Sequence, residues 1–228
     1  MSDLDFSPPA PSQNALGTGA ASPVRKRPKP GERRVQILQA LATMLERPGA
    51  ERITTAALAA RLDVSEAALY RHFASKAQMF EGLIDFIEQS VFSLVNQIVE
   101  REVASASLDA PRDAAAGRRQ ATRMVIMLIQ FAEKNPGMTR VMVGDALVFE
   151  NERLQQRMNQ FFDKIESAFK QSLRGLSEGS GSATPSVDTQ VRASVLTAFV
   201  VGRLQRFARS GFKRLPSEHI EASLALIL

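Results

Sequence analysis

The chain has 228 residues, of which 44% are hydrophobic and 23% are charged, a balance typical of a folded protein with a buried core. It contains no cysteine and only two histidines, which excludes disulfide scaffolds, thiolate zinc sites and cysteine nucleophiles and argues against a multi-histidine metal site. The net charge is +5, and residues 24–34 alone hold six basic residues against one acidic residue, which equals that whole charge. A short basic arm of this kind predicts an acidic polymer or a membrane surface as its partner.

No segment of the sequence is predicted to enter a membrane. The first residues are acidic and lack the continuous apolar core that a signal peptide needs. The longest apolar run, residues 124–131, is interrupted by Gln130 and is much shorter than the roughly 18 residues of a spanning helix. We therefore expect a cytoplasmic protein.

Two segments are rich in small and turn-forming residues. Residues 1–31 are dominated by Pro, Ser, Ala and Gly and are expected to be disordered, and residues 175–186 are expected to form a flexible loop between helices. Elsewhere, apolar residues recur with the helical period of 3.6, and no alternating strand pattern is found. The sequence therefore predicts an all-α fold.

The start and stop signals of the helices give their approximate limits. Ser75 and Gln78 form a capping box ahead of a long helix, and Ser217 is expected to cap the last one. In chain order, the expected helices cover about 31–45, 54–62, 65–73, 75–98, 109–135, a short turn before 144, 145–173, 191–211 and 217–227.

The segment from Ile53 to Phe73 carries the most informative pattern. Thr54 or Thr55 can cap a short helix that ends at Leu62, because a side-chain oxygen there accepts a bond from a free backbone amide. Asp63 occupies the turn, where it tolerates a left-handed backbone, and Ser65 caps a second short helix. Two short helices joined by so tight a turn form a helix-turn-helix, whose second helix fits the major groove of DNA.

The second short helix carries side chains that suit nucleic acid. Hydrogen-bond donors lie along it and just after it, whereas alanines allow a close approach to a groove. The donors are Ser65, Tyr70, Arg71, His72 and Lys76, and the alanines are Ala67 and Ala68. The basic arm directly precedes the first helix, where it can follow phosphates or the minor groove. The alternative interpretation is a plain packing pair of alanine-rich helices.

The chain resembles the tetracycline-repressor (TetR) family, through the stretch ITTAALAARLDVSEAALYRHFASKAQMF at residues 53–80. Within that family it is most similar to the nucleoid-occlusion factors, through residues 33–46, 64–90, 131–166 and 202–216. The resemblance implies an extension with the basic arm at 1–31, a helix-turn-helix DNA-binding domain at 32–76 and a helical dimerisation and partner-binding domain at 77–228.

The resemblance also implies a function and its residues. Such proteins bind palindromic sites in double-stranded DNA as homodimers and, when bound, block assembly of the tubulin-like division protein FtsZ over the nucleoid. By this likeness Thr54 and Thr55 contact a phosphate, Tyr70, Arg71, His72 and Lys76 contact the DNA, largely its backbone, and Ser65, Glu66 and Ala67 lie nearest the bases. FtsZ would contact Phe86 and the pair Lys134–Asn135, with Lys134 in place of an arginine.

Several alternatives remain open at this point. A ligand-responsive TetR-type repressor is the second candidate function, for which Met124, Met127, Phe131 and Met142 would line a pocket instead of filling the core. Phe86 can belong to the core, Lys134 and Asn135 can simply end a helix, and Phe199 with Gly202 suits contact either between subunits or within one chain. No catalytic motif is found, so we expect no enzyme, no metal, no cofactor and no small-molecule ligand.

Overall fold

The computed structural model describes residues 31–47, 53–105, 114–178 and 183–228, and every regular element in those residues is a helix. The predicted all-α fold is therefore confirmed. The expectations for residues 1–30 and for a helix start at Asp109–Pro111 lie outside the described residues. In chain order the elements are α1 (Glu32–Leu45), α2 (Thr55–Leu62), α3 (Glu66–Tyr70), α4 (Lys76–Ser105), α5 (Ala114–Lys134), α6 (Pro136–Met142), η1 (Asp145–Leu147), α7 (Glu152–Glu178), α8 (Pro185–Arg209) and α9 (Ile220–Ile227).

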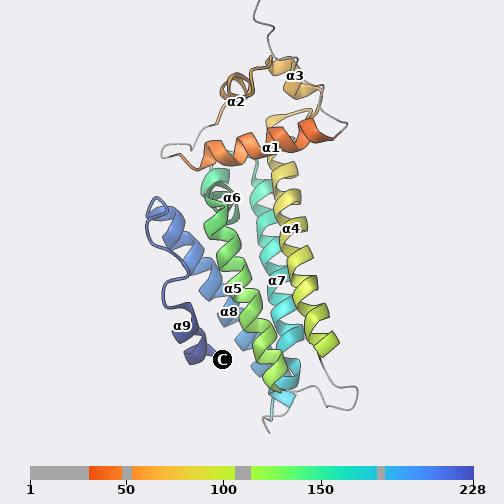
Figure 1. The fold of residues 1–228 in the computed structure, drawn as a ribbon, viewed down its shortest axis with the longest axis vertical. Helices are drawn as coiled ribbons and strands as arrows, with labels where there is room; N and C mark the ends of the chain where they lie inside the picture. The colour runs from red at the N-terminus through yellow and green to blue at the C-terminus, as the bar shows by residue number, and fades with distance from the viewer. Residues whose placement is uncertain (1–30, 48–52, 106–113, 179–182) are drawn as a thin grey trace, which may run out of the picture.

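The helices form two parts, which we call the head (α1–α3) and the body (α4–α9). Figure 1 shows α1 lying across the ends of the body helices, with α2 and α3 on its far side. The long helices α4, α5, α7 and α8 run side by side, and α7 contacts α4, α5 and α8. The short helix α9 lies against α8.

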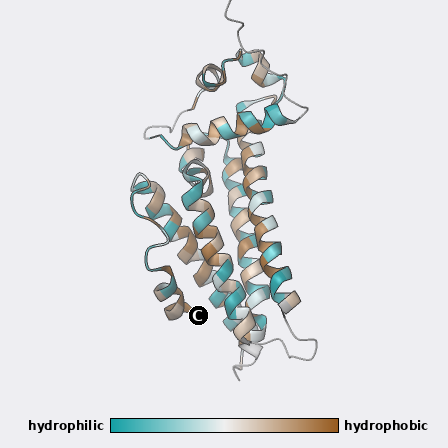
Figure 2. Ribbon diagram, viewed as in Figure 1, coloured by the Kyte–Doolittle hydropathy of each residue, from teal (hydrophilic) through white to brown (hydrophobic). Residues whose placement is uncertain are grey.

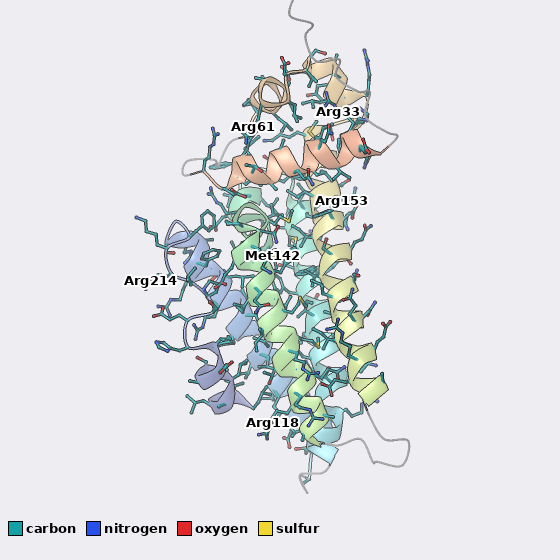
Figure 3. The ribbon with its side chains drawn as sticks, viewed as in Figure 1. Arg33, Arg61, Arg118, Met142, Arg153 and Arg214 are labelled. Carbon is teal, nitrogen blue, oxygen red and sulfur yellow. The ribbon has the colours of Figure 1, made fainter. Side chains whose placement is uncertain are left out.

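The core of the body is built from the apolar stripes of the long helices. Polar and apolar residues alternate along each of them (Figure 2), as expected when one face of a helix is buried. Met142, labelled in Figure 3, is 2% exposed, and Met124 is 0% exposed. Met127 and Phe131 pack against the same core from partly buried positions. These four residues fill the core, which is the simpler of the two interpretations left open by the sequence.

Two glycines allow helices to approach one another closely. A Cβ atom added to Gly137 in α6 would lie 1.9 Å from the carbonyl oxygen of Ala42 in α1, and one added to Gly117 in α5 would lie 2.4 Å from that of Ser172 in α7. No side chain fits at such distances, so glycine is required at both positions. Gly137 thereby fixes the joint between head and body.

The structure corrects the predicted boundaries at two helix starts. The helix expected from Asp145 is broken, because η1 ends at Leu147 and α7 begins only at Glu152, where the side chain of Asn151 accepts the amide of Arg153 at 3.0 Å. An asparagine that bonds to the backbone in this way favours a new helix start over a continuous helix. The last helix is preceded by His219 in the left-handed conformation, without a side-chain cap, so the cap predicted at Ser217 is wrong.

The turn-rich segment after α7 also differs from its predicted limits. Residues 175–178 continue α7 instead of belonging to the loop, and α8 begins at Pro185, with proline in its first turn. The capping box at the start of α4 is present in a shifted form. Ser75 accepts the amide of Gln78 at 3.2 Å, whereas the Gln78 side chain accepts the amide of Ala74 at 2.9 Å.

Candidate nucleic-acid interface

The helix-turn-helix is held by local bonds at each of its predicted turning points. The hydroxyl of Thr54 accepts the amide of Ala57 at 3.1 Å, and the hydroxyl of Ser65 accepts the amide of Ala68 at 3.3 Å. Between the two helices, Asp63 adopts the left-handed conformation with φ 53° and ψ 52°. The predicted caps at Thr54 and Ser65 and the predicted turn residue are therefore confirmed.

The inner side of the helix-turn-helix is apolar and buried. Leu58 and Ala59 from α2, Leu69 from α3 and Phe73 just after it are between 1% and 3% exposed. They pack in one cluster with the buried residues of α1. Since Ala59 and Leu69 are the two positions where the helices must touch, the small residue at 59 permits the tight crossing.

The outer side of α3 carries the side chains predicted to contact DNA. Glu66, Ala67 and Tyr70 are exposed, as are the flanking residues Ser65, Arg71 and His72. The phenol of Tyr70 is 45% exposed, which is high for so large a residue. The burial of Leu69 and Phe73 turns this polar side toward solvent. The helix α3 itself lies on the side of α1 that is away from the body (Figure 1). Such a short, exposed helix has the shape that enters a major groove.

A polar network joins the start of α2 to α3. The hydroxyl of Thr55 donates to Glu66 Oε2 at 2.5 Å, and the hydroxyl of Tyr70 donates to Thr55 Oγ1 at 3.5 Å. Three residues expected to contact DNA thus also contact one another. Thr54 and Thr55 sit beside the free amides of the α2 N-terminus, a position that attracts anions such as phosphate.

Arg34 in α1 contacts the chain just after α3, a contact that sequence reasoning did not predict. Its Nη1 donates to the carbonyl oxygen of His72 at 2.8 Å, and its guanidinium carbon lies 4.2 Å from the centroid of the Phe73 ring. The sequence marks Arg34 only as one cation of the basic arm. A separation of 38 residues leaves no local pattern from which this contact could be found.

Lys76, the first residue of α4, forms an ion pair with Glu150, in the turn before α7. The Glu150 side chain is 9% exposed and that of Lys76 is 32% exposed. The ammonium group also lies 5.7 Å from the ring of Phe80. A cation expected to contact a DNA phosphate is therefore held by a carboxylate of the body, and sequence reasoning missed this partner because it lies 74 residues away.

Further ion pairs continue along the seam between α4 and α7. Arg153 lies 3.6 Å from Glu81, and Arg157 donates to Asp85 at 2.7 Å. The hydrogen bond with Asp85, together with the charge of nearby carboxylates, raises the pKa of Arg157 above its ordinary value. The side chain of Arg157 is 27% exposed, so the pair is partly shielded from water. This seam connects the start of α4, at the head, to the middle of the body.

The residues expected to contact FtsZ lie on α4 and at the end of α5. Phe86 is half-buried and packs against the core, so it presents only part of its ring to solvent. Lys134 is exposed. The Asn135 side chain donates to the carbonyl oxygen of Phe131 at 2.8 Å, and its backbone carbonyl accepts the amide of Thr139 at 2.9 Å. Asn135 thus forms the corner between α5 and α6, whereas Lys134 is available at the surface.

The outer face of α8 is apolar. Val187, Val191 and Val195 are spaced by four residues and are 57%, 55% and 46% exposed, whereas Leu196 and Val200 face the core at 0%. Gly202, which is partly exposed, continues this face, and a Cβ atom added to it would meet no atom of the described residues within 4 Å. Among the described residues this glycine therefore serves no close contact, in contrast to Gly117 and Gly137.

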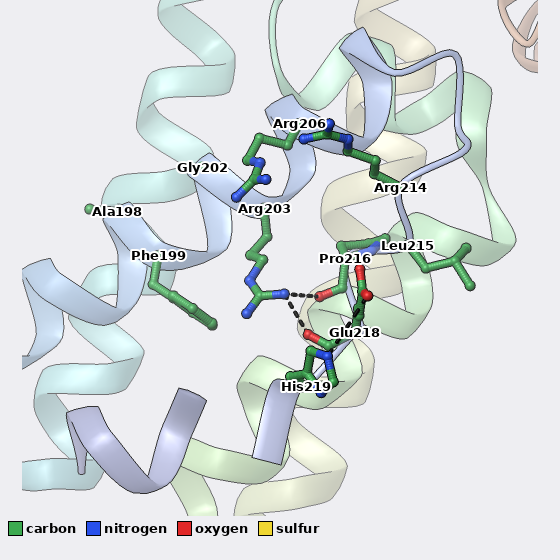
Figure 4. Close-up of a pocket in the computed structure, with 10 residues that line it drawn as sticks. All are labelled: Ala198, Phe199, Gly202, Arg203, Arg206, Arg214, Leu215, Pro216, Glu218 and His219. Atoms are coloured by element: carbon green, nitrogen blue, oxygen red, sulfur yellow. Dashed lines mark hydrogen bonds and ion pairs between the residues drawn. The ribbon is translucent and has the colours of Figure 1, made fainter. Parts of the chain in front are cut away.

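A cleft of about 580 Å³ adjoins this face, where α8 meets the segment before α9 (Figure 4). Arg203 donates to the carbonyl oxygens of Glu218, at 2.6 Å, and of Pro216, at 3.4 Å, and lies 4.9 Å from the ring of Phe199. It therefore binds the connection before α9 to α8. Arg206 and Arg214 line the cleft and are exposed at the surface.

The described residues hold neither a candidate metal site nor a membrane-spanning helix. In residues 31–47, 53–105, 114–178 and 183–228, no group of three or more His, Asp or Glu side chains could hold a metal ion. Within the same ranges, no helix has the length and apolar character needed to cross a membrane.

Two family models match the chain. Residues 37–83 match the family described as bacterial regulatory proteins of the tetR family, and residues 119–228 match the tetracyclin repressor-like C-terminal domain named SlmA-like. The first match covers α2, α3 and parts of α1 and α4, and the second covers most of the body.

Individual proteins are similar over nearly their whole length. The chain is 50% identical over 201 residues to the nucleoid occlusion factor SlmA of Aliivibrio fischeri strain MJ11, covering 88% of this chain and 96% of that protein. It is 48% identical over 197 residues to that of Vibrio cholerae, covering 86% and 93%. Both relatives are named as nucleoid occlusion factors.

Solved structures share the fold at much lower identity. The fatty acid degradation regulator FadR of Bacillus halodurans matches with a TM-score of 0.67 and 15% identity, covering 86% of this chain and 95% of that one. The regulator FadR of Bacillus subtilis, solved in complex with stearoyl-CoA, matches with a TM-score of 0.65 and 13% identity, covering 85% and 96%. At these identities the likeness concerns the fold alone.

Proposed function

The chain belongs to the SlmA family of nucleoid occlusion factors, within the TetR family of bacterial regulators, and from this premise we propose a function for each of its surfaces. The head binds palindromic sites in double-stranded DNA, the outer face of α8 joins two copies into a homodimer, and the DNA-bound dimer antagonises FtsZ assembly over the nucleoid. The protein acts in the cytoplasm on the chromosome and regulates cell division without catalysing a reaction.

The observation that carries the DNA-binding proposal is the exposed polar side of α3. Buried Leu69 and Phe73 orient the helix, and donors on its other side are free to reach a groove. In this proposal Ser65, Glu66 and Ala67 read base edges, because the N-terminal residues of a recognition helix lie deepest in the major groove. Thr54, Thr55, Tyr70, Arg71, His72 and Lys76 contact phosphates and sugars and set the register.

The apolar face of α8 supports dimerisation. Three exposed valines in one row are costly in water, and a second copy that covers them removes that cost. Gly202 lies in the same row and has open space around its Cα, so it allows a second α8 to approach closely. Two heads related by a two-fold axis would present their α3 helices to half-sites about 34–36 Å apart, one turn of DNA.

The proposed FtsZ contact lies on the side of the body nearest the head. Phe86 contributes an apolar surface that is half exposed, and Lys134 contributes an exposed positive charge at the end of α5. An apolar anchor together with a cation suits an acidic peptide that also carries apolar side chains. Asn135 fixes the corner between α5 and α6, because its hydrogen bonds to Phe131 and Thr139 define where α5 ends.

The experiment that tests the whole proposal measures FtsZ polymerisation by sedimentation, with purified protein and DNA. A duplex that contains a palindromic site, selected from the genome by mapping the bound DNA, should increase the inhibition of FtsZ. A duplex of the same length and scrambled sequence serves as the control. If the protein binds the palindrome while FtsZ assembly stays unchanged at saturating DNA, the antagonism is refuted.

Two variants separate the proposed surfaces. Phe86→Ala and Lys134→Ala should weaken FtsZ antagonism and leave DNA affinity within about twofold, because neither side chain lies on the head. Equal loss of both activities would refute the FtsZ site. DNA affinity is measured for both variants on the palindromic duplex and on the scrambled duplex. A variant that has lost its fold is recognised because it binds neither duplex.

The alternative, a ligand-responsive repressor, requires polar side chains directed at a bound small molecule. The buried threonines among the described residues of the body donate instead to backbone carbonyls one turn earlier, as Thr189 does to Pro185 and Thr197 to Ala193. The buried carboxylate of Glu102 is paired with Arg123. These satisfied groups favour the nucleoid occlusion function, for which no cofactor or small ligand is needed.

A further inference from the structure

We propose that Arg34 is a positioning residue that sets the orientation of α3, and thereby the preference of the head for its DNA site. This inference rests on the proposed function of α3 as the recognition helix. Arg34 lies in the first turn of α1, and its side chain reaches the chain directly after α3. It acts through its contacts with His72 and Phe73, not by reading a base.

The recognition helix is too short to hold its own orientation. It contains five residues, of which Leu69 alone is buried. A helix of little more than one turn has almost no internal hydrogen bonds, so its direction depends on what holds its two ends. At its N-terminal end, Glu66 accepts the hydroxyl of Thr55 at 2.5 Å, which connects it to α2.

The C-terminal end is held by Phe73 and Arg34 together. Phe73 is 1% exposed, and its ring faces Gly82 of α4, where an added Cβ atom would lie 2.9 Å from the ring. The guanidinium of Arg34 covers the ring at 4.2 Å and donates to the carbonyl oxygen of His72 at 2.8 Å. The side chain therefore restrains the backbone at residue 72 and the ring at residue 73 at once.

The geometry distinguishes this role from that of a general cation. Arg33 is the neighbouring cation in the same turn of α1, and its guanidinium donates to Gln36 within α1 at 3.0 Å. Both arginines attract DNA by their charge, but Arg34 alone of the two contacts the segment after α3. The difference between Arg34→Ala and Arg33→Ala therefore isolates the positioning effect from the loss of one charge.

The first measurement uses the only tyrosine of a chain that has no tryptophan. Tyr70 lies on α3, so its fluorescence reports on the recognition helix without a label. In the full chain without DNA, Arg34→Ala should add fast local motion to the anisotropy decay of Tyr70, whereas Arg33→Ala should leave the decay unchanged. Identical decays in the two variants would overturn the proposal.

The second measurement compares affinity for a palindromic duplex and for a random duplex over a range of salt. Both variants should lose affinity for random DNA by the same factor, since each removes one cation. Arg34→Ala should lose about tenfold more affinity for the palindrome than Arg33→Ala, because a misaligned helix loses base contacts. Equal losses on both duplexes would show that Arg34 acts by charge alone.

Arg34→Lys provides a second variant, which retains the charge but lacks the planar group that covers Phe73. It should bind random DNA as the wild type does and recover only part of the preference for the palindrome. Complete recovery would refute positioning by the guanidinium. If the wild-type protein itself shows no palindrome preference, the proposed function fails, and the Tyr70 decay still decides the role of Arg34.

Discussion

The outer side of the head and the outer face of α8 are both exposed, but they carry opposite chemistry. The head presents hydroxyls, a phenol, an imidazole and cations around a short helix, whereas α8 presents Val187, Val191 and Val195 in one row. A polar surface with many donors suits a hydrated, charged partner such as DNA. An apolar row beside a glycine with open space around it suits a surface of the same kind, which a second copy supplies in the proposed homodimer. The difference favours a different partner for each of these two surfaces.

The two surfaces are also supported differently. The polar side chains of the head are held by bonds within and between short helices, as in the contacts of Thr55 with Glu66 and of Arg34 with His72. The valines of α8 need no such polar contacts, because this helix of 25 residues is held in place by its buried opposite face. Specificity on the head therefore depends on precise polar contacts, and affinity on α8 depends on buried area.

The largest expected effect comes from placing charge on the apolar face. The double variant Val191→Asp/Val195→Asp should convert dimers to monomers, since buried carboxylates facing one another are strongly unfavourable. In a dimer, binding of one head places the other head at a high effective concentration near the second half-site. A monomer lacks this advantage, so affinity for the palindrome should fall about a hundredfold or more. Light scattering after size-exclusion chromatography measures the first effect and fluorescence anisotropy the second.

A control pair on α7 makes that result specific. The double variant Gln155→Asp/Asn159→Asp changes two residues that have the same spacing and are also exposed, but lie on a polar face. This control should remain dimeric. Retention of the dimer in the valine variant would exclude the α8 face as the interface.

The second prediction compares Gly137, which lies against the backbone of another helix, with Gly202, which has open space around it. Gly137→Ala should lower the free energy of unfolding by about 2 kcal/mol or more, because its Cβ atom would overlap the carbonyl oxygen of Ala42. Gly202→Ala should raise it by roughly 0.5–1 kcal/mol, since alanine favours a helix and meets no atom. Urea denaturation of both variants in the monomeric valine background measures these changes without interference from dimerisation. A loss of stability in Gly202→Ala would contradict the open-face interpretation.

The third prediction separates backbone contacts from base contacts on the head. Lys76→Ala should weaken binding to all DNA sequences by about tenfold. It should also reduce the slope of log affinity against log salt concentration by about one, which corresponds to one phosphate contact. Ala67→Gln should instead change the preferred sequence, because residue 67 is exposed near the start of α3 and adds a side chain toward the bases. Binding to a library of randomised duplexes at several salt concentrations distinguishes the two outcomes.

The ion pair of Lys76 with Glu150 provides a control variant that should raise DNA affinity instead of lowering it. Glu150→Gln removes the carboxylate that neutralises Lys76, so affinity for random DNA should rise about two- to threefold as the freed cation meets phosphate. Weaker binding in Glu150→Gln would mean that the pair serves to hold α4 in place for DNA binding.

The smallest expected effect concerns the end of α5, which belongs to neither surface. Lys134→Arg should strengthen FtsZ antagonism about two- to threefold, since a guanidinium binds a carboxylate through two hydrogen bonds. DNA affinity should not change, because Lys134 is in the body. The concentration of protein that halves FtsZ sedimentation measures the effect, and a parallel change in DNA affinity would show that the residue acts through folding.

The sequence predicted well those features that depend on neighbouring residues. The caps at Thr54 and Ser65 and the turn at Asp63 are each formed within three or four residues, so the pattern of side chains was sufficient. It predicted poorly where two local signals compete, as at residues 145–152, where the side chain of Asn151 starts a new helix. Helical periodicity identified the helix expected at 191–211, but it did not reveal that Val191 and Val195 face away from the core.

The sequence by itself therefore determined the helical class, the helix-turn-helix and the family, because these follow from short-range periodicity, capping and matched motifs. Only the tertiary structure decided what each exposed residue contacts. The tertiary structure brings Lys76 into contact with Glu150 and Arg34 into contact with the chain just after α3. It also shows that Gly137 lies against another helix whereas Gly202 has open space around it. These are contacts between positions far apart in the chain, and their geometry depends on how whole helices pack.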